Sequence, residues 1–251
     1  MPEWYWEGDD FAALWYSDAN DRIPNILRYT SKFTYQGDFE RHRADVLCRY
    51  DTDEFERIQH ALNTLTHSDM RIEIPGGTSK YKGSRGVDRI HRIIGARTDH
   101  YGAILYQRTQ GDTDGLIRLR LCRADHLATR VVEALPNRPP GKRPTLTVHP
   151  QDLQHIRRSP TGTTPAERYQ KLIAELDGGA GAQLLVGAFN SEPAPTNRVQ
   201  WYDVTDDGRY LETRGEHITV RPVSAKDLAA RFDGWIEREL ERRREDEYAP
   251  W

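Results

Sequence analysis

One order of predicted elements occurs twice along this chain of 251 residues: a helix, four strands and a second helix. Apolar residues at helical spacing predict the helices, and alternating apolar residues between turn signals predict the strands. The first copy has a helix over 53–65, strands over 70–74, 87–97, 101–108 and 116–121, and a helix over 125–135. The second copy has a helix over 165–176, strands over 183–189, 198–204, 209–214 and 218–221, and a helix from Ser224 onward.

Short residue matches support this repeat. Arg89-Ile90-His91 aligns with Arg198-Val199-Gln200, and Asp125-His126-Leu127-Ala128 aligns with Lys226-Asp227-Leu228-Ala229. The identities are few, so a chance likeness of two αββββα patterns stays open. Taken as a true duplication, the pattern predicts an α/β (α+β) fold. It would be a quasi-two-fold single domain with a central antiparallel-rich sheet and flanking helices.

Prolines mark the predicted boundary between the two copies. Seven of the 14 prolines lie between residues 136 and 165, and clustered prolines are typical of connections between folded segments. We therefore expect an N-terminal half over 1–135, a Pro-rich connection over 136–164 and a C-terminal half over 165–251.

The composition disfavours several classes of protein. The chain is 37% hydrophobic and 30% charged, with a net charge of −3, which is typical of a folded protein and not of a basic nucleic-acid binder. No apolar run reaches the ~20 residues of a membrane helix, and the start Met1-Pro2-Glu3-Trp4 lacks the features of a signal peptide. We expect a cytoplasmic protein in which Cys48 and Cys122 are buried free thiols.

Aromatic residues are concentrated in the first 16 positions. Phe11, Leu14 and Trp15 have the i, i+3, i+4 spacing of one helical face, so a short helix is predicted after Asp9 or Asp10 as N-cap. The aromatic side chains are interpreted as a lid over the core, with a ligand cage as the alternative. The aromatic residues concerned are Trp4, Tyr5, Trp6, Phe11, Trp15 and Tyr16.

Patterns typical of catalysis, metal binding or cofactor binding are not found. The nine histidines are scattered, and neither H-E-x-x-H nor C-x-x-C occurs. The stretch Gly178–Gly181 is predicted to follow a helix and precede a strand, which is the reverse of a dinucleotide loop. Asp203–Gly208 is interpreted as a hairpin turn in which Gly208 supplies a positive φ. We therefore expect no enzyme activity, no metal and no cofactor.

The loop over 76–86 is the first candidate binding element. It contains four glycines and the cations Lys80, Lys82 and Arg85 around Tyr81, with no acidic residue. Long loops in compact domains are often functional. Contact with a nucleic-acid backbone is an alternative for this loop, but the acidic balance of the whole chain disfavours it.

The C-terminal half resembles a known family. The residues that carry the resemblance are Arg198-Val199-Gln200-Trp201-Tyr202-Asp203-Val204-Thr205-Asp206-Asp207-Gly208-Arg209-Tyr210-Leu211, followed by Ile218-Thr219-Val220-Arg221-Pro222 and Asp227-Leu228. With these residues the C-terminal half resembles the EspG family. Phe11-x-x-Leu14-Trp15 with Pro24 and Leu27 extends the resemblance more weakly toward the N-terminus. These proteins are cytosolic chaperones of actinobacterial type VII (ESX) secretion systems, so the resemblance implies an EspG-like quasi-two-fold fold.

The resemblance also implies a partner. A chaperone of this family binds the tip of the PPE protein in a PE–PPE heterodimer and keeps it soluble and secretion-competent, without catalysis, cofactor, nucleic acid or membrane. The loop between the second and third strands of the repeat and the region 224–239 are implied to lie near the client. A divergent small-molecule-binding protein or enzyme without a recognisable motif is the alternative. The residues implied to bind the partner are Gly77, Thr78, Lys80, Tyr81, Lys82, Arg85, Lys226, Arg231 and Glu239.

Overall fold

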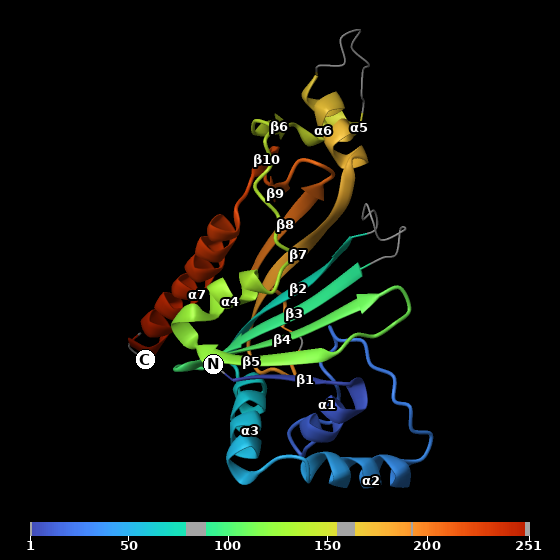
Figure 1. Cartoon of the computed structure of the whole chain (residues 1–251). Helices are drawn as coiled ribbons and strands as arrows, with labels where there is room; N and C mark the ends of the chain where they lie inside the picture. The colour runs from blue at the N-terminus through green and yellow to red at the C-terminus, as the bar shows by residue number, and fades with distance from the viewer. Residues whose placement is uncertain (1, 79–88, 155–163, 192, 249–251) are drawn as a thin grey trace. The chain divides into compact units, whose positions relative to one another are not determined.

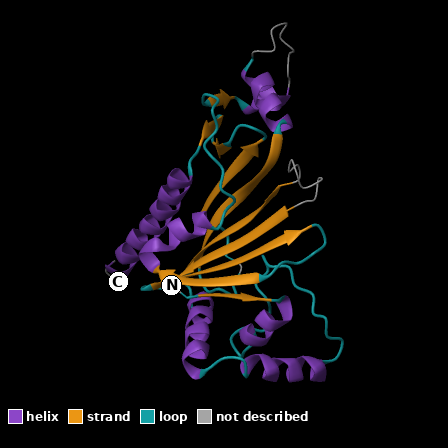
Figure 2. Ribbon diagram, in the orientation of Figure 1, coloured by secondary structure: helices purple, strands orange, loops and turns teal. Residues whose placement is uncertain are grey.

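The strands of the protein form one sheet of ten strands in the computed structural model, which describes residues 2–78, 89–154, 164–191 and 193–248 (Figures 1 and 2). Their order is β1-β5-β4-β3-β2-β7-β8-β9-β10-β6. The strands are β1 (Glu3–Trp6), β2 (Met70–Thr78), β3 (Arg89–Arg97), β4 (Tyr101–Gln110), β5 (Ile117–Arg123), β6 (Leu146–Val148), β7 (Leu176–Val186), β8 (Asn197–Val204), β9 (Arg209–Arg214) and β10 (Ile218–Pro222).

The order of helices and strands confirms the predicted fold class. It runs α3-β2-β3-β4-β5-α4 and then α6-β7-β8-β9-β10-α7, and the four strands of each run are neighbours in the sheet. The fold is therefore a quasi-two-fold α+β arrangement, to which β1 and β6 add one strand at either end. The described helices are α1 (Gly8–Trp15), α2 (Gln36–Leu47), α3 (Thr52–Thr66), α4 (Leu127–Glu133), α5 (Pro150–Gln154), α6 (Pro165–Ala174) and α7 (Ala225–Tyr248).

Two compact units make up the chain, and neither is continuous in sequence. The first unit comprises residues 1–75, 89–135 and 183–197, and the second comprises 76–88, 136–182 and 198–251. Strands β2 and β7 each contribute to both units. The division into sequential halves with a connection over 136–164 stays a prediction.

In the first unit, helices α3 and α4 cover opposite faces of strands β3–β5 (Figure 1). Because side chains alternate along a strand, Ile94 and Ala96 point into the core that contains α3, while Gly95 faces α4. A Cβ atom on Gly95 would lie 2.2 Å from Cγ2 of Val131. The absence of a side chain at this position therefore allows α4 to pack directly on the sheet.

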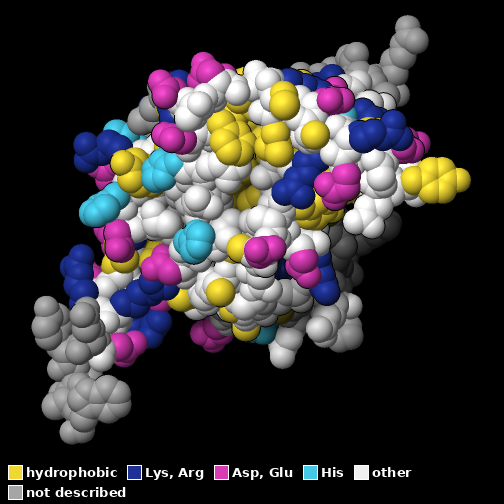
Figure 3. Space-filling model, turned by 90° about the horizontal axis from the view of Figure 1, so that it is seen from below, with side chains coloured by type: hydrophobic (Ala, Val, Ile, Leu, Met, Phe, Trp, Pro, Cys, Tyr) yellow, Lys and Arg dark blue, Asp and Glu magenta, His cyan; other side chains and the backbone are white. Residues whose placement is uncertain are grey.

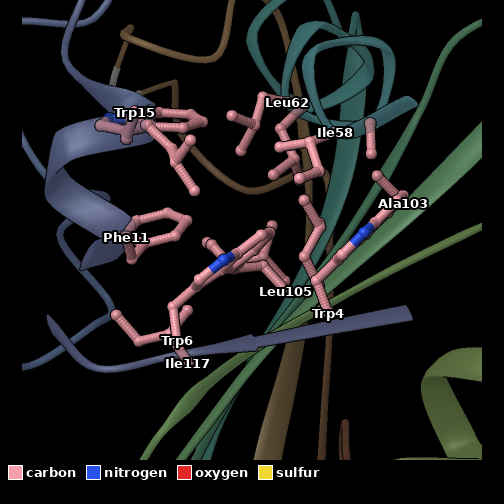
Figure 4. Close-up of a cluster of buried hydrophobic side chains, with 14 of the residues drawn as sticks. Trp4, Trp6, Phe11, Trp15, Ile58, Leu62, Ala103, Leu105 and Ile117 are labelled. Atoms are coloured by element: carbon pink, nitrogen blue, oxygen red, sulfur yellow. The ribbon is translucent and has the colours of Figure 1, made fainter. Parts of the chain in front are cut away.

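Four of the six N-terminal aromatic residues, Trp4, Trp6, Phe11 and Trp15, are buried in this core (Figure 4), and Tyr16 packs against it. The lid interpretation is wrong for Tyr5, whose side chain is exposed. The rings of Trp4 and Trp6 are stacked with centroids 6.2 Å apart, and those of Phe11 and Trp15 with centroids 5.7 Å apart. The Nε1 atom of Trp6 donates a hydrogen bond to the hydroxyl of Tyr50 at 2.7 Å. The buried Trp6 ring thus keeps a polar partner for its N–H group.

The predicted cap of the first helix is wrong. Helix α1 begins at Gly8 with Glu7 as N-cap, so Asp9 and Asp10 lie inside its first turn. The Asp9 carboxylate instead accepts hydrogen bonds from the hydroxyls of Tyr29 and Ser31 and from the backbone N–H of Lys32. These contacts attach the segment after α1 to the helix.

One of the two thiol predictions is also wrong. Both cysteines are free, but only Cys122 is buried, and Cys48 is exposed. Cys48 is the C-cap residue of α2, a helix in which only Val46 is buried. Its position at the end of a largely solvated helix explains its exposure. Burial raises the pKa of the Cys122 thiol to about 11.

A second apolar core lies in the second unit and joins α6 to the strands β6, β9 and β10. Helix α6 begins with a capping box in which Thr164 Oγ1 accepts from the Glu167 N–H and the Glu167 carboxylate accepts from the Thr164 N–H. The Tyr169 hydroxyl on α6 donates to Oε2 of Glu212 on β9 at 2.9 Å. The helix is therefore fixed to the sheet by both apolar and polar contacts.

Figure 3 shows the molecule from below, the side on which α2 lies in Figure 1. Acidic and basic side chains are interspersed on this face, and hydrophobic side chains gather among them. A face of mixed charge lacks the single-sign field that steers a polyanion.

Candidate partner-binding region

The predicted binding loop follows Gly76–Thr78, the end of β2 that belongs to the second unit. The Oγ1 atom of Thr78 donates a hydrogen bond to the carbonyl oxygen of Asp177 on β7. A Cβ atom on Gly178 would lie 2.8 Å from the carbonyl oxygen of Gly77. The backbones of β2 and β7 thus approach closely at residues 77 and 78, immediately before the loop.

This close approach corrects the interpretation of Gly178–Gly181. The stretch does not precede a strand but lies within β7, which begins at Leu176. Gly179 has φ of 159°, and a Cβ atom there would lie 2.5 Å from the carbonyl oxygen of Trp201. The glycines serve contact between strand backbones, which a side chain would obstruct.

The remaining residues implied for the loop, Lys80, Tyr81, Lys82 and Arg85, lie outside the described residues. The other implied residues belong to α7. We therefore build the described part of the region from α7 and from the strand that precedes it, β10.

Helix α7 has a well-defined beginning. Ser224 Oγ accepts a hydrogen bond from the Asp227 N–H at 3.1 Å, and Asp227 Oδ2 accepts one from the Ser224 N–H at 2.9 Å. This is a capping arrangement with Asp in place of the usual Glu or Gln. The hydrogen bonds from Ser224 hold the pKa of Asp227 below its ordinary value. The first turn of α7 is thus fixed independently of the predicted client.

The apolar side of α7 is buried, as its helical spacing predicted. Lys226 is exposed in the first turn, and Arg231 is half-buried about one and a half turns further on, so neither belongs to the buried side. Burial, followed by the nearby charges of Arg221 and Arg238, lowers the pKa of the Arg231 guanidinium. Arg221 and Arg238 were not among the residues implied to bind a partner. The buried apolar residues are Leu228, Phe232, Trp235 and Ile236.

Glu239 has a different environment from Lys226 and Arg231. Its side chain is only 6% exposed, and its carboxylate accepts hydrogen bonds from Arg242 Nη2 at 2.7 Å and Arg243 Nε at 3.1 Å. Hydrogen bonds from Arg242, aided by Arg243, hold the pKa of Glu239 low despite its burial. The carboxylate is thus engaged within the helix, and the structure does not bring Glu239 together with Lys226 on one exposed face.

The Gly208-Arg209-Tyr210 motif has a structural role. Arg209 forms a buried ion pair with Asp203, with Nε 2.7 Å from Oδ1, and its Nη2 donates to the Pro136 carbonyl at 3.0 Å. The Tyr210 hydroxyl donates to Asp207 at 2.6 Å and accepts from the Arg143 N–H at 2.8 Å. The motif therefore holds the segment after α4 against β9.

The role predicted for Gly208 needs correction. The positive φ in this turn, 57°, is found at Asp206 and not at Gly208. An aspartate tolerates this left-handed conformation better than most residues. A Cβ atom on Gly208 would lie 2.6 Å from the carbonyl oxygens of Pro139 and Pro140. Glycine is thus required here for close approach of the 139–140 backbone.

A small-molecule function would need a cavity, and one of about 320 Å³ lies in the first unit beside Arg71. The Arg71 guanidinium is already bonded there to Glu73 at 2.8 Å and to the Ser191 carbonyl at 3.1 Å. This guanidinium, one polar group of the cavity wall, is thus already paired within the protein. Across the described ranges, no group of three or more His, Cys, Asp and Glu side chains could hold a metal ion. No helix in the same ranges is long and apolar enough to cross a membrane.

Comparison with known proteins agrees with the resemblance of the C-terminal half to the EspG family. The model of the EspG family matches residues 8–233 and so spans most of the chain. A search of curated proteins found no match. Because the family match includes both runs of four strands and the start of α7, the chain belongs to the EspG family, whose members are chaperones associated with type VII secretion.

Proposed function

We propose that this protein binds the tip of a PPE protein within a PE–PPE heterodimer in the cytoplasm. It keeps the pair soluble and competent for ESX secretion, and it acts by binding alone. The observation that carries the proposal is the family match over residues 8–233. Covering an exposed apolar patch of a partner is a physical task that needs a fixed surface and no reactive group.

Two parts of the second unit are proposed to contact the client. One is the loop that follows Gly77 and Thr78 at the end of β2, where β2 and β7 approach closely. The other is α7, where Lys226 is exposed and Arg231 is half-buried. We assign to Glu239 a supporting role, because its carboxylate fixes Arg242 and Arg243 on the same helix.

Co-expression with a PE–PPE pair encoded near this chain tests the proposal. We expect a stable complex of the three chains on size exclusion, and an increase in the soluble fraction of the PPE protein. Substitution Tyr81→Ala together with Lys226→Ala should weaken the complex. Lys171→Ala is the matched control, because Lys171 is also exposed on a helix of the second unit.

The outcome that refutes the proposal is equally defined. If folded protein captures no PE–PPE pair from its own genome, and the PPE protein stays equally soluble without it, the proposed function is wrong. If the pair binds but the double variant and Lys171→Ala bind alike, the function stands and the assigned contacts are wrong.

A further inference from the structure

The cavity of about 320 Å³ beside Arg71 combines polar and apolar walls within the first unit. Its lining comes from the segment 21–25 after α1, from β2 and β3, and from the segment 189–191 after β7. Its volume lies at the lower end of the range of about 300–1,000 Å³ that is typical of small-molecule sites. The cavity therefore has room for a molecule of the size of a single amino acid.

Contacts within the protein fix the position of the Arg71 side chain, which is only 5% exposed. Its Nε donates to Oε1 of Glu73 at 2.8 Å, its Nη2 to the Ser191 carbonyl at 3.1 Å, and its Nη1 to the Ala188 carbonyl at 3.4 Å. Its guanidinium carbon lies 5.3 Å from the centroid of the Phe189 ring. A guanidinium group has five N–H donors. These contacts therefore leave one N–H on Nη1 and one on Nη2 without a partner among the residues that the structure describes.

The Glu73 carboxylate supplies acceptors in the same wall. Its Oε1 accepts from Arg71, and its Oε2 accepts from Nε2 of Gln183 on β7 at 3.2 Å. An ionised carboxylate has about four acceptor positions, so Glu73 keeps the capacity for further hydrogen bonds. The side chain of Glu73 is 19% exposed. The wall thus offers donors and acceptors next to each other.

The charges of the cavity lining balance. The charged residues are two arginines and two acidic residues, and Arg71 pairs with Glu73 while Arg22 lies 3.9 Å from Asp21. A wall without net charge does not favour a simple anion or a simple cation. A ligand with one charge of each sign engages the remaining N–H groups of Arg71 and the remaining acceptors of Glu73 together.

We propose that this cavity binds a zwitterionic α-amino acid with an apolar side chain. Its carboxylate accepts from Nη1 and Nη2 of Arg71, and its ammonium group donates to Glu73, so that both contacts are charge-assisted hydrogen bonds. Its side chain lies against Ile23, Pro24 and Phe189, which line the cavity. The inference is independent of the proposed function, because the proposed client contacts belong to the second unit.

Calorimetric titration and thermal melting of the full-length protein with L-leucine, L-methionine and L-phenylalanine test the inference. At least one of them should bind with a Kd below about 1 mM and raise the melting temperature. Three relatives of the best ligand each lack one recognised group: its N-acetyl derivative lacks the ammonium group, its amide lacks the carboxylate, and glycine lacks the side chain. Each should bind at least about tenfold more weakly.

The variant Glu73→Gln tests the acidic side of the wall. It keeps the size of the side chain and removes its charge, so we expect at least about tenfold weaker binding of the amino acid. Glu56→Gln is the matched control, because Glu56 is an exposed glutamate on α3 in the same unit. The control should change the affinity by less than about twofold. If Glu73→Gln does not fold, the three relatives tested on the wild-type protein decide the question.

Three results would overturn the inference. One is the absence of saturable binding of all three amino acids to the folded wild-type protein. Another is equal binding of an amino acid and its N-acetyl or amide derivative, because the two charges would then not be recognised. The third is equal binding by wild type and folded Glu73→Gln. Capture of a PE–PPE pair by the same samples tests the proposed function separately, and its failure would leave this inference unaffected.

Discussion

Substitution of Arg209 by Met should strongly destabilise the second unit. Arg209 is 2% exposed and Asp203 is 7% exposed, and two hydrogen bonds of 2.7 and 3.1 Å join their side chains. Methionine fills similar space but leaves the Asp203 carboxylate buried without its counter-charge. The Pro136 carbonyl also loses its donor. Removal of one partner of a buried ion pair costs about 3–5 kcal/mol, so we expect a loss of this size in the free energy of unfolding.

Urea denaturation followed by circular dichroism measures this loss, and thermal melting provides a second estimate. A loss of about 3–5 kcal/mol corresponds to a decrease of roughly 6–20 °C in the melting temperature of a chain this long. Arg244→Met is the control for loss of an exposed arginine, and it should change stability by less than about 0.5 kcal/mol.

The pair Arg209→Met with Asp203→Leu completes the test. Because the double variant leaves no unpaired buried charge, it should be less destabilised than Arg209→Met alone. A loss below about 1 kcal/mol in Arg209→Met would refute the reasoning, since the ion pair would then contribute little. A double variant less stable than the single one would show that packing, and not the orphaned carboxylate, dominates.

Two further predictions concern the first unit. Gly95→Ala should lower the free energy of unfolding by about 1–3 kcal/mol, because the new Cβ would lie 2.2 Å from Val131 Cγ2. Val131→Ala in the same chain should recover part of this loss in urea denaturation, and the absence of any recovery would locate the strain elsewhere. Burial acts to raise the pKa of Asp9, but hydrogen bonds from Ser31, Lys32 and Tyr29 outweigh it and bring the pKa below 3.8. Asp9 therefore contributes stability above pH 3.8 that is lost as pH falls through the lower folded value, and Asp9→Asn should flatten this acid dependence in pH-dependent melting.

The order of elements could be predicted because each element has a local signal. Turn residues such as Thr98-Asp99 separate strands with alternating apolar residues, and Gly or Pro marks the ends of several helices. Helix α2 has no such signal, because Val46 is its only buried residue. Strand β1 was missed for another reason: it pairs with β5, and Glu3 lies opposite Arg120 across more than a hundred residues of sequence. Pairing at that distance leaves no pattern within either strand.

Only part of the candidate binding region could be predicted from the sequence. Arg231 was implied by the family resemblance, but Arg221 lies on a separate element and Arg238 carries no pattern by itself. The seven-residue spacing of Arg231 and Arg238 was present in the sequence. The spacing alone does not show which arginines are paired: of the five arginines on α7, Arg242 and Arg243 form ion pairs with the Glu239 carboxylate. Only the contacts of each guanidinium group separate Arg242, which is paired, from Arg238.

Under the proposed function, the residues that identify the family and the residues that select a client are different sets. Arg209 and Tyr210 carry the resemblance, yet both side chains are buried and hold the segment around Pro136 and Arg143. Such contacts preserve the fold whatever the client is. If the chain binds a PE–PPE pair as proposed, selection of one pair over another must depend on groups that a partner can reach, such as the exposed Lys226. Exchange of these exposed residues between two members of the family should then transfer client preference, while exchange at Arg209 or Tyr210 should change stability alone.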